Sequence, residues 1–309
     1  MSVEISVVIP TFNEEGNISM LYNRIKEQFV LANITEYEIL FINDGSSDRS
    51  FEIILELAQK DTQLKYISFS KNFGHQNALK AGLDHAQGKA VISMDADLQH
   101  PPALLPELIR AWKNGAKVVY TVRKEEEGLS FFKKSTSKLF YWLVNKLAEH
   151  PIIPGAADFR LLDRQVVEVL KQHTEKELFY RGIVSGLGFE QKAIEFKADK
   201  RNAGKTKYSF KKMAKFAIAG ITSSSAKPLY FSIYMGSLMA LLGFLYGAYA
   251  IFLALFTDKT IAGWTSIVTS IVFIGGIQLI MMGILGIYLG KIFKQSKNRP
   301  LYIIETKNI

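Results

Sequence analysis

The chain has 309 residues, enough for one large domain or two ordinary ones. It contains no cysteine, which excludes disulfides, thiolate catalysis and cysteine-ligated zinc. The formal net charge of +9 is unevenly spread, because residues 1–196 carry −3 and residues 197–309 carry +12. A basic C-terminal third is typical of proteins that bind nucleic acid or an anionic membrane surface.

Residues 1–122 alternate strand-like and helix-like segments. Short β-branched or aromatic runs, of the kind that a buried parallel strand needs, lie at residues 4–10, 37–43, 64–69, 90–95 and 116–122. Between them, apolar residues spaced by three and four predict helices at residues 14–30, 47–61, 75–86 and 102–114. This alternation predicts an α/β fold with a doubly wound, mostly parallel sheet.

Polar clusters follow three of these strands, at the sheet edge where ligands bind in such folds. They read TFNEEGN after the first strand, NDGSSD after the second and DADLQHPP after the fourth. Each of the first two is, by itself, also typical of a turn or a helix cap. At neighbouring strand ends, however, Glu14 and Asp44 are placed to accept hydrogen bonds from a base or ribose, and the loop SKNFGHQNALKAG is placed near a phosphate.

Asp95, Asp97 and Gln99 form the strongest candidate site. In an extended segment residues i and i+2 face the same way, so these three side chains are expected to present oxygen ligands together. Oxygen ligands without cysteine or a histidine cluster suit Mg²⁺ or Mn²⁺. A solvated turn is the alternative, and the position at the end of a buried strand disfavours it.

Two segments have the pattern of helices that lie in a membrane interface. Residues 130–147 place aromatic and leucine side chains on one half of a helical wheel and most lysines, including Lys133, on the other half. Lys146 is the exception, because it falls on the apolar half. Residues 208–227 are a weaker, juxtamembrane case. An ordinary amphipathic helix packed on the domain is the alternative.

Two long uncharged runs, residues 228–257 and 260–290, each exceed the roughly 20 residues that cross a bilayer as a helix. Only Asp258 and Lys259 separate them, so they predict a transmembrane hairpin whose ends emerge on one side. Basic residues crowd that side, including the tail at residues 291–309, and the positive-inside rule places both termini in the cytoplasm. A buried pair of soluble helices is the alternative. The N-terminus reads directly into a strand, without the pattern of a cleavable leader.

Six motifs occur in order along the chain and precede the two predicted spans: PTFNEEGN, NDGSSDRS, the N-F-G loop, DADLQHPP, GAADFRLLDR and KRNAGKTKYS. Together they resemble the family-2 GT-A glycosyltransferases of the polyprenyl-phosphate branch. That branch includes dolichol-phosphate mannose synthases and bacterial bactoprenol (undecaprenyl-phosphate) glucosyltransferases. The resemblance implies a Rossmann-like GT-A catalytic domain at residues 1–207, which transfers a sugar from a nucleotide diphosphate to a lipid phosphate.

The resemblance also implies a role for each matching residue. Those expected to bind the nucleotide sugar are Pro10, Phe12, Glu14, Asp44, Asp95, Arg201 and Lys207. Those expected to hold the metal are Asp95, Asp97 and Gln99. Those expected to meet the lipid phosphate are Arg123, Lys133, Ser137 and Arg160, for which surface charge is the alternative. The implied catalytic residues are Asp97 and Asp158, with Asp158 acting as a general base or as a group that orients the acceptor or balances charge.

The resulting hypothesis is an inverting glycosyltransferase that uses Mg²⁺ or Mn²⁺ and moves a sugar from a UDP-sugar, glucose being favoured, onto undecaprenyl phosphate. The expected partners are those two substrates, the bilayer of the bacterial cytoplasmic membrane and further copies of the chain, with a tetramer as one option, but no nucleic acid. Alternative sugars are GlcNAc, mannose from GDP-mannose and an aminopentose. A processive polysaccharide synthase is disfavoured because Q-x-x-R-W is absent. A non-catalytic membrane scaffold or nucleic-acid binder is disfavoured by the intact charged set Asp95, Asp97, Asp158 and Arg201.

Overall fold

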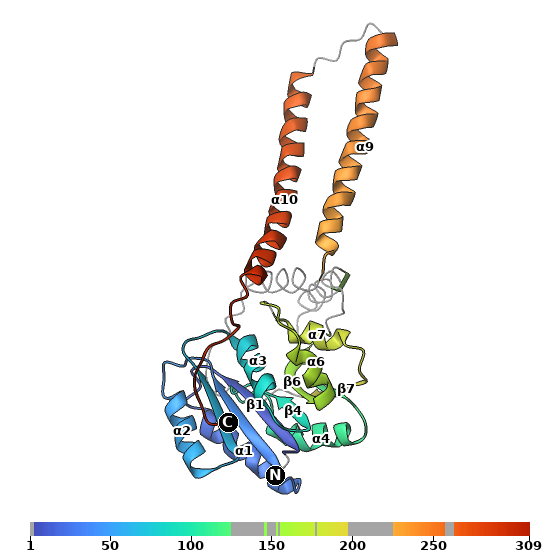
Figure 1. The fold of residues 1–309 in the computed structure, drawn as a ribbon. Coiled ribbons are helices and arrows are strands. Elements are labelled where there is room, and N and C mark those ends of the chain that lie inside the picture. The colour runs from blue at the N-terminus through green and yellow to red at the C-terminus, as the bar shows by residue number, and fades with distance from the viewer. Residues whose placement is uncertain are drawn as a thin grey trace.

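The protein, seen in a computed structural model, consists of an α/β domain from which two long helices project side by side (Figure 1). The residues that the structure describes are 3–124, 145–146, 153, 155–176, 178–196, 225–256 and 263–309. Both the first and the last described strands lie in the α/β domain, so the chain leaves this domain for the long helices and then returns to it.

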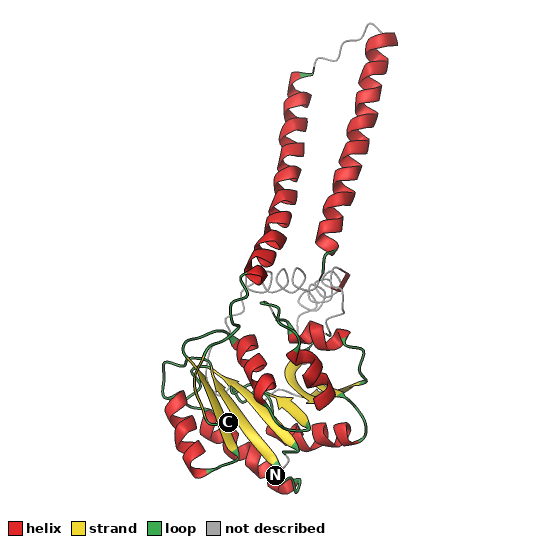
Figure 2. Cartoon of the chain, viewed as in Figure 1, coloured by secondary structure: helices red, strands yellow, loops and turns green. Residues whose placement is uncertain are grey.

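In the described part of the chain, eight strands form one mixed sheet with the order β7-β5-β6-β4-β1-β2-β3-β8 (Figure 2). The strands are β1 Ile5–Thr11, β2 Tyr37–Asn43, β3 Leu64–Phe69, β4 Ala90–Ser93, β5 Val118–Arg123, β6 Ala156–Asp163, β7 Gln191–Phe196 and β8 Ile304–Lys307. Strands β4, β1, β2 and β3 are parallel to one another. Strand β6 runs antiparallel between β4 and β5, and β8 runs antiparallel along the edge of β3.

Helices cover both faces of the sheet. They are α1 Ile18–Leu31, α2 Ser50–Lys60, α3 His75–His85, α4 Leu105–Lys113 after the 3₁₀ turn Pro102–Leu104, α6 Arg164–Lys171 and α7 Tyr180–Gly186. Apolar side chains of α1, α2 and α4 pack on one face, and those of α3, α6 and α7 pack on the other. Side chains of β1 alternate between these two cores, with Val7 and Ile9 in the first and Val8 in the second, because successive residues of a strand face opposite ways.

The five strands expected in the first 122 residues are all present, and the α/β fold is confirmed. Three boundaries differ in ways that concern the polar loops. Helix α1 begins at Ile18 rather than at residue 14, α2 begins at Ser50 rather than at residue 47, and β4 ends at Ser93 rather than at residue 95. In each case the polar motif lies in a loop beyond the regular element. Strands β6, β7 and β8 were not predicted; β7 runs parallel to β5, whereas the antiparallel β6 and β8 make the sheet mixed.

The two long helices are α9, Lys227–Phe256, and α10, Trp264–Ser296. Each contains a stretch that is long and apolar enough to cross a membrane, and none of either stretch is buried inside the protein. Residues 291–309 were expected to form a basic tail. Instead, α10 continues to Ser296 and the following segment forms β8 in the sheet of the α/β domain. The predicted interfacial helices lie almost entirely outside the described residues, apart from residues 145–146 and 225–227.

Gly82 sets the distance between α3 and the sheet. A Cβ atom at this position would lie 2.1 Å from Val8 Cγ1, a buried side chain of β1 with no room to move. We expect Gly82→Ala to destabilise the protein by about 1–3 kcal/mol through overpacking. Thermal unfolding of the detergent-purified protein measures this. Gly16→Ala is the matched control, since nothing lies within 4 Å of a Cβ there. Equal melting temperatures for the two variants would contradict the tight contact.

Candidate functional site

The loops that follow β1 and β2 are joined by hydrogen bonds into one surface at the carboxyl edge of the sheet. The Asn13 amide donates to Ser46 Oγ at 3.1 Å, and the Ser47 amide donates to Asn13 Oδ1 at 2.8 Å. The Glu14 amide donates to Ser50 Oγ at 2.8 Å. Of the residues expected to line the nucleoside pocket here, Pro10 is buried within β1, whereas Phe12 is 46% exposed. Phe12 therefore presents an exposed ring at this surface, and the contacts of Phe12 and Pro10 with the nucleotide sugar stay predictions.

Asp44 lies at the end of β2 and connects it to the start of α3. Its two carboxylate oxygens accept hydrogen bonds from the backbone amides of Phe73, at 2.7 Å, and Gly74, at 2.9 Å. Burial raises the pKa of Asp44 above its ordinary value, although these two amides act in the opposite direction. The carboxylate thus fixes the loop before α3, and its expected contact with a nucleoside stays a prediction.

Gly45 allows this close approach. Its φ of +67° lies in the region that favours glycine, and a Cβ atom would lie 2.4 Å from the backbone carbon of Lys71. Any other residue at this position would have both an unfavourable backbone conformation and a steric clash with Lys71. The loops after β2 and β3 are consequently held in contact beside Asp44.

The DADLQ segment is a turn, which corrects the expectation of an extended run. The strand ends at Ser93, and Leu98 adopts a φ of +63°. Asp97 accepts hydrogen bonds from Gln99, from the backbone amide at 3.1 Å and from the side-chain Nε2 at 2.5 Å. The Gln99 Oε1 atom faces Arg123 Nη1 of β5 at 3.5 Å. Gln99 therefore supports Asp97 within the turn, and its role as a metal ligand stays a prediction.

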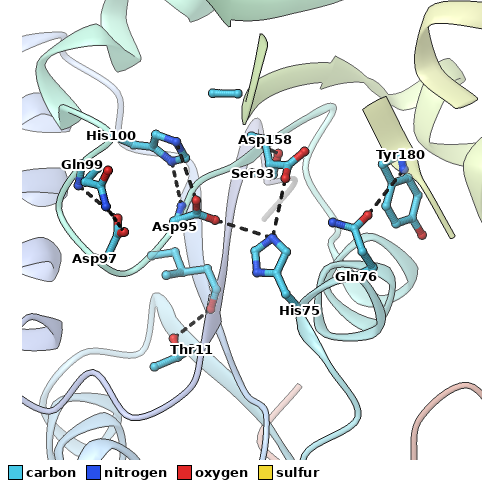
Figure 3. Close-up of polar contacts among 12 residues, drawn as sticks. Thr11, His75, Gln76, Ser93, Asp95, Asp97, Gln99, His100, Asp158 and Tyr180 are labelled. Carbon is cyan, nitrogen blue, oxygen red and sulfur yellow. Dashed lines mark hydrogen bonds and ion pairs between the residues drawn. The ribbon is translucent and has the colours of Figure 1, made fainter. Parts of the chain in front are cut away.

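Two histidines flank Asp95 (Figure 3). The Asp95 amide donates to His100 Nδ1 at 3.0 Å, and His100 Nε2 lies 3.7 Å from Asp95 Oδ2. His75 Nε2, at the first residue of α3, lies 3.6 Å from Asp95 Oδ1 and 3.9 Å from Asp158 Oδ2. His75 is therefore the side chain that stands between the two carboxylates.

Strand β6 brings Asp158 to this edge. Because β6 is antiparallel to β4 and pairs Arg160 with Ser93, Asp158 lies just beyond the end of β4, on the side of Asp95. Ser93 Oγ donates to the Asp158 carbonyl oxygen at 2.5 Å. On the opposite face of β6, Phe159 stacks on the His100 ring with centroids 5.2 Å apart. One strand thus positions both the carboxylate and the histidine.

Asp158 is held by two arginines. Arg181 of α7 donates to it through two nitrogens, Nε to Oδ1 at 3.0 Å and Nη2 to Oδ2 at 2.9 Å, and Arg160 Nη2 lies 3.4 Å from Oδ1. Burial by itself raises the pKa of Asp158. The guanidiniums, Arg181 before Arg160, outweigh burial and hold that pKa well below its ordinary value. Asp158 is therefore an ionised carboxylate with little affinity for a proton.

The donor atoms fit a hard divalent cation only in part. Asp95 and Asp97 supply carboxylate oxygens, and the Asp95 side chain is 36% exposed. Within the ranges that the structure describes, no group of three or more His, Asp or Glu side chains is arranged to hold a metal ion. A cation here would need oxygen ligands from a bound substrate, which is how Mg²⁺ is commonly held beside phosphates.

The structure brings most of the predicted site residues to one edge of the sheet. Those that lie there are Phe12, Glu14, Asp44, Asp95, Asp97, Gln99, Arg123, Asp158 and Arg160. Pro10 is buried within β1 beside this edge, and the other four predicted residues, Lys133, Ser137, Arg201 and Lys207, lie outside the described residues.

Three side chains at the site were not predicted: His75, His100 and Arg181. His75 and His100 lie within the N-F-G loop and DADLQHPP, so the sequence motifs marked their loops as part of the site without marking the histidines themselves. Arg181 lies in ELFYRG, which no motif marked, and only the packing of α7 against β6 brings it to Asp158.

Comparisons with known proteins agree with this geometry. The model of the family described as Glycosyl transferase family 2 matches residues 6–170. The uncharacterized glycosyltransferase YkcC of Bacillus subtilis is 47% identical over 98% of this chain and 94% of its own length. The bactoprenol glucosyl transferase of Shigella phage SfV is 42% identical over 99% of both chains.

Among solved structures, a mannosyltransferase from Pyrobaculum calidifontis in complex with GDP-Man and Mn²⁺ is similar in fold. It has a TM-score of 0.53 and 14% identity, over 94% of this chain and 88% of the other. The chain is a glycosyltransferase of family 2, with a GT-A-like α/β domain.

Proposed function

We propose that the protein transfers a sugar, glucose being the favoured one, from a UDP-sugar to undecaprenyl or another polyprenyl phosphate. The reaction would take place at the cytoplasmic face of a bacterial membrane, with both termini of the chain in the cytoplasm. Support comes from the bactoprenol glucosyl transferases that match this chain over nearly its whole length. Two helices that are apolar enough to span a bilayer also suit a lipid acceptor, which itself resides in the bilayer.

The ionised state of Asp158 is the main observation that favours a phosphate acceptor. A hydroxyl acceptor needs a general base, and an efficient base has a pKa near the working pH. Arg181 and Arg160 hold the pKa of Asp158 far below that range. A phosphate monoester has a second pKa near 6 and is therefore largely ionised at neutral pH without a base. The site is thus suited to an acceptor that arrives as an anion, with Asp158 orienting neighbouring groups and balancing charge.

A divalent cation, Mg²⁺ or Mn²⁺, would be held by Asp95 and Asp97 together with the donor diphosphate. When bound, such an ion neutralises the charge that develops on the leaving nucleotide. Asp97 is kept in place by hydrogen bonds from the Gln99 backbone amide and side chain, and Asp95 by the hydrogen bond from its backbone amide to His100 Nδ1. The two loops that contain Phe12 and Asp44 would hold the nucleoside.

The remaining assignments follow the same proposal. Arg123 and Arg160, with Lys133 and Ser137, would meet the acceptor phosphate, whereas Arg201 and Lys207 would close over the donor diphosphate. Attack on C1 from the face opposite the leaving UDP, in one displacement, would invert the anomeric configuration and give a β-linked lipid-phosphate sugar. Further copies of the chain would assemble into a homo-oligomer through the apolar helices.

A donor panel tests the reaction. We expect radiolabelled sugar to pass from UDP-glucose to undecaprenyl phosphate, and to appear in the lipid extract, faster than from UDP-GlcNAc, GDP-mannose or a UDP-aminopentose. Wild-type protein without acceptor lipid is the control. Transfer from another nucleotide sugar alone would replace glucose as the substrate, and the absence of any lipid product would refute the proposed reaction class.

Asp97→Ala tests the metal site. Loss of a cation ligand is expected to lower the rate on the order of 10²-fold or more, because a bound metal contributes several kcal/mol of charge stabilisation. The measurement is kcat for sugar transfer, with Mn²⁺ and with excess EDTA. Glu168→Ala, which removes an exposed carboxylate of α6, is the matched control. Wild-type activity that persists in EDTA would contradict a metal-dependent transfer.

Asp158→Asn separates charge balance from base catalysis. If Asp158 balances the arginines, the ratio of mutant to wild-type kcat should stay nearly constant from pH 6 to pH 8.5, since no proton is taken up. If it were a base, the ratio should climb as the acceptor loses its own proton above about pH 6. The measurement uses saturating donor and lipid, and a climb of tenfold or more would favour the base.

A further inference from the structure

The chain returns from the apolar helices and binds the α/β domain along β3. The Ser70 amide donates to the Ile303 carbonyl at 3.1 Å, just outside the β3–β8 ladder. At the other end of β8, Asn308 Oδ1 accepts from the Tyr66 amide at 2.6 Å. The end of α10 also contacts the domain, because the Lys176 amide donates to Gln295 Oε1 at 3.0 Å. The segment after the helices is thus fixed to the domain from one end to the other.

Within this segment Tyr302 contacts the end of α3. Its ring stacks on Phe69 of β3, with centroids 5.1 Å apart and an angle of 12° between the planes. Its hydroxyl donates to Asp84 Oδ2 at 2.9 Å, in the last turn of α3. The second oxygen of Asp84 accepts from Lys80, a buried lysine that also donates to the Lys171 carbonyl at 3.0 Å. Tyr302 therefore completes a partly buried polar cluster at the C-terminal end of α3.

The first residues of α3, at its other end, contact the candidate site in three ways. The amide of Gly74, the residue before the helix, donates to Asp44 at 2.9 Å. His75 stands between the carboxylates of Asp95 and Asp158. Gln76 Oε1 accepts from the Tyr180 amide at 3.4 Å, directly before Arg181. The loop after β2, the carboxylates of Asp95 and Asp158, and helix α7 therefore all contact the start of this one helix.

Helix α3 is short and packs closely on the sheet, so we expect a displacement of its C-terminal end to move its N-terminal end as well. It has 11 residues, hence a length of roughly 16 Å. Gly82 lies against Val8 of β1 without space for a Cβ atom, which makes this contact a fixed point on the sheet. Phe73 provides a second connection between Tyr302 and the candidate site. Its ring packs edge-to-face with Phe69, the residue on which Tyr302 stacks, with centroids 5.7 Å apart.

We propose that Tyr302 and Asp84 are positioning residues for the transferase site. The segment that follows the apolar helices holds the C-terminal end of α3, and through this helix it sets the places of Asp44, His75 and Arg181. Full activity then requires Tyr302 to be docked on Phe69 and Asp84. The inference rests on the proposed function only where it takes UDP-glucose transfer as the activity readout.

Hydrogen exchange of the full-length protein in detergent tests this directly. Tyr302→Phe keeps the ring on Phe69 and removes only the hydrogen bond to Asp84. We expect exchange of the amides of residues 71–77 to rise by about tenfold or more, the effect of losing a hydrogen bond to a charged group. Asn308→Ala is the matched control, because it loosens the other end of β8 without touching α3, and it should leave these amides within about twofold of wild type.

Activity of the same variants gives the second readout. We expect Tyr302→Phe to raise the KM for UDP-glucose and to lower kcat, whereas Asn308→Ala keeps both. Unchanged exchange in residues 71–77, or exchange that rises equally throughout β1 and β2, would overturn the proposal, since the hydroxyl would then be irrelevant or a general stability contact. So would local loosening with unchanged kcat and KM. Local loosening in a protein whose wild type transfers no glucose would support the positioning role and refute the proposed donor.

Discussion

Asp158 is a buried carboxylate at the edge of a sheet, and the site is built around the need to compensate its charge. Burying an ion without partners costs several kcal/mol, so such a group persists only when it is paired. Arg160 supplies one partner from the same strand, and Arg181 supplies a two-nitrogen contact from α7. Pairing fixes α7 against β6 and, by stabilising the ionised form, makes Asp158 a poor base. The structural and the chemical consequence have the same electrostatic cause.

The remaining polar groups are ordered by the start of α3. Asp44 binds the amides that precede the helix, and His75 extends from its first turn toward Asp95 and Asp158. Because Gly82 allows α3 to lie directly on β1, these contacts come from one rigid element rather than from independent loops. The far end of α3 meets Tyr302, so the segment that follows the apolar helices and the candidate site share this helix.

Sequence patterns predicted structure correctly where a single physical requirement, such as burial of apolar side chains, determined the local structure. Short runs of β-branched and aromatic residues suit strands buried on both faces, and the parallel strands β1 to β4 appear as expected. The family was recognisable from motifs in order, and the matches to glycosyltransferases agree. Alternation failed at Asp95 to Gln99, because the chain turns after Ser93 and Leu98 takes a left-handed conformation that no residue preference announced.

The sequence by itself determined the α/β class, the two apolar helices, the acidic motif at Asp95 to Gln99 and the family, because each depends on local periodicity or on short motifs. Only the tertiary structure decided which side chains meet. Strand β6 enters the sheet antiparallel, which carries Asp158 to Asp95, and β8 pairs with β3 across more than 200 residues of chain. Arg181 reaches Asp158 from a helix that no motif marks. Such contacts arise from long-range pairing and from the electrostatic requirement of a buried charge, neither of which leaves a periodic signal in the sequence.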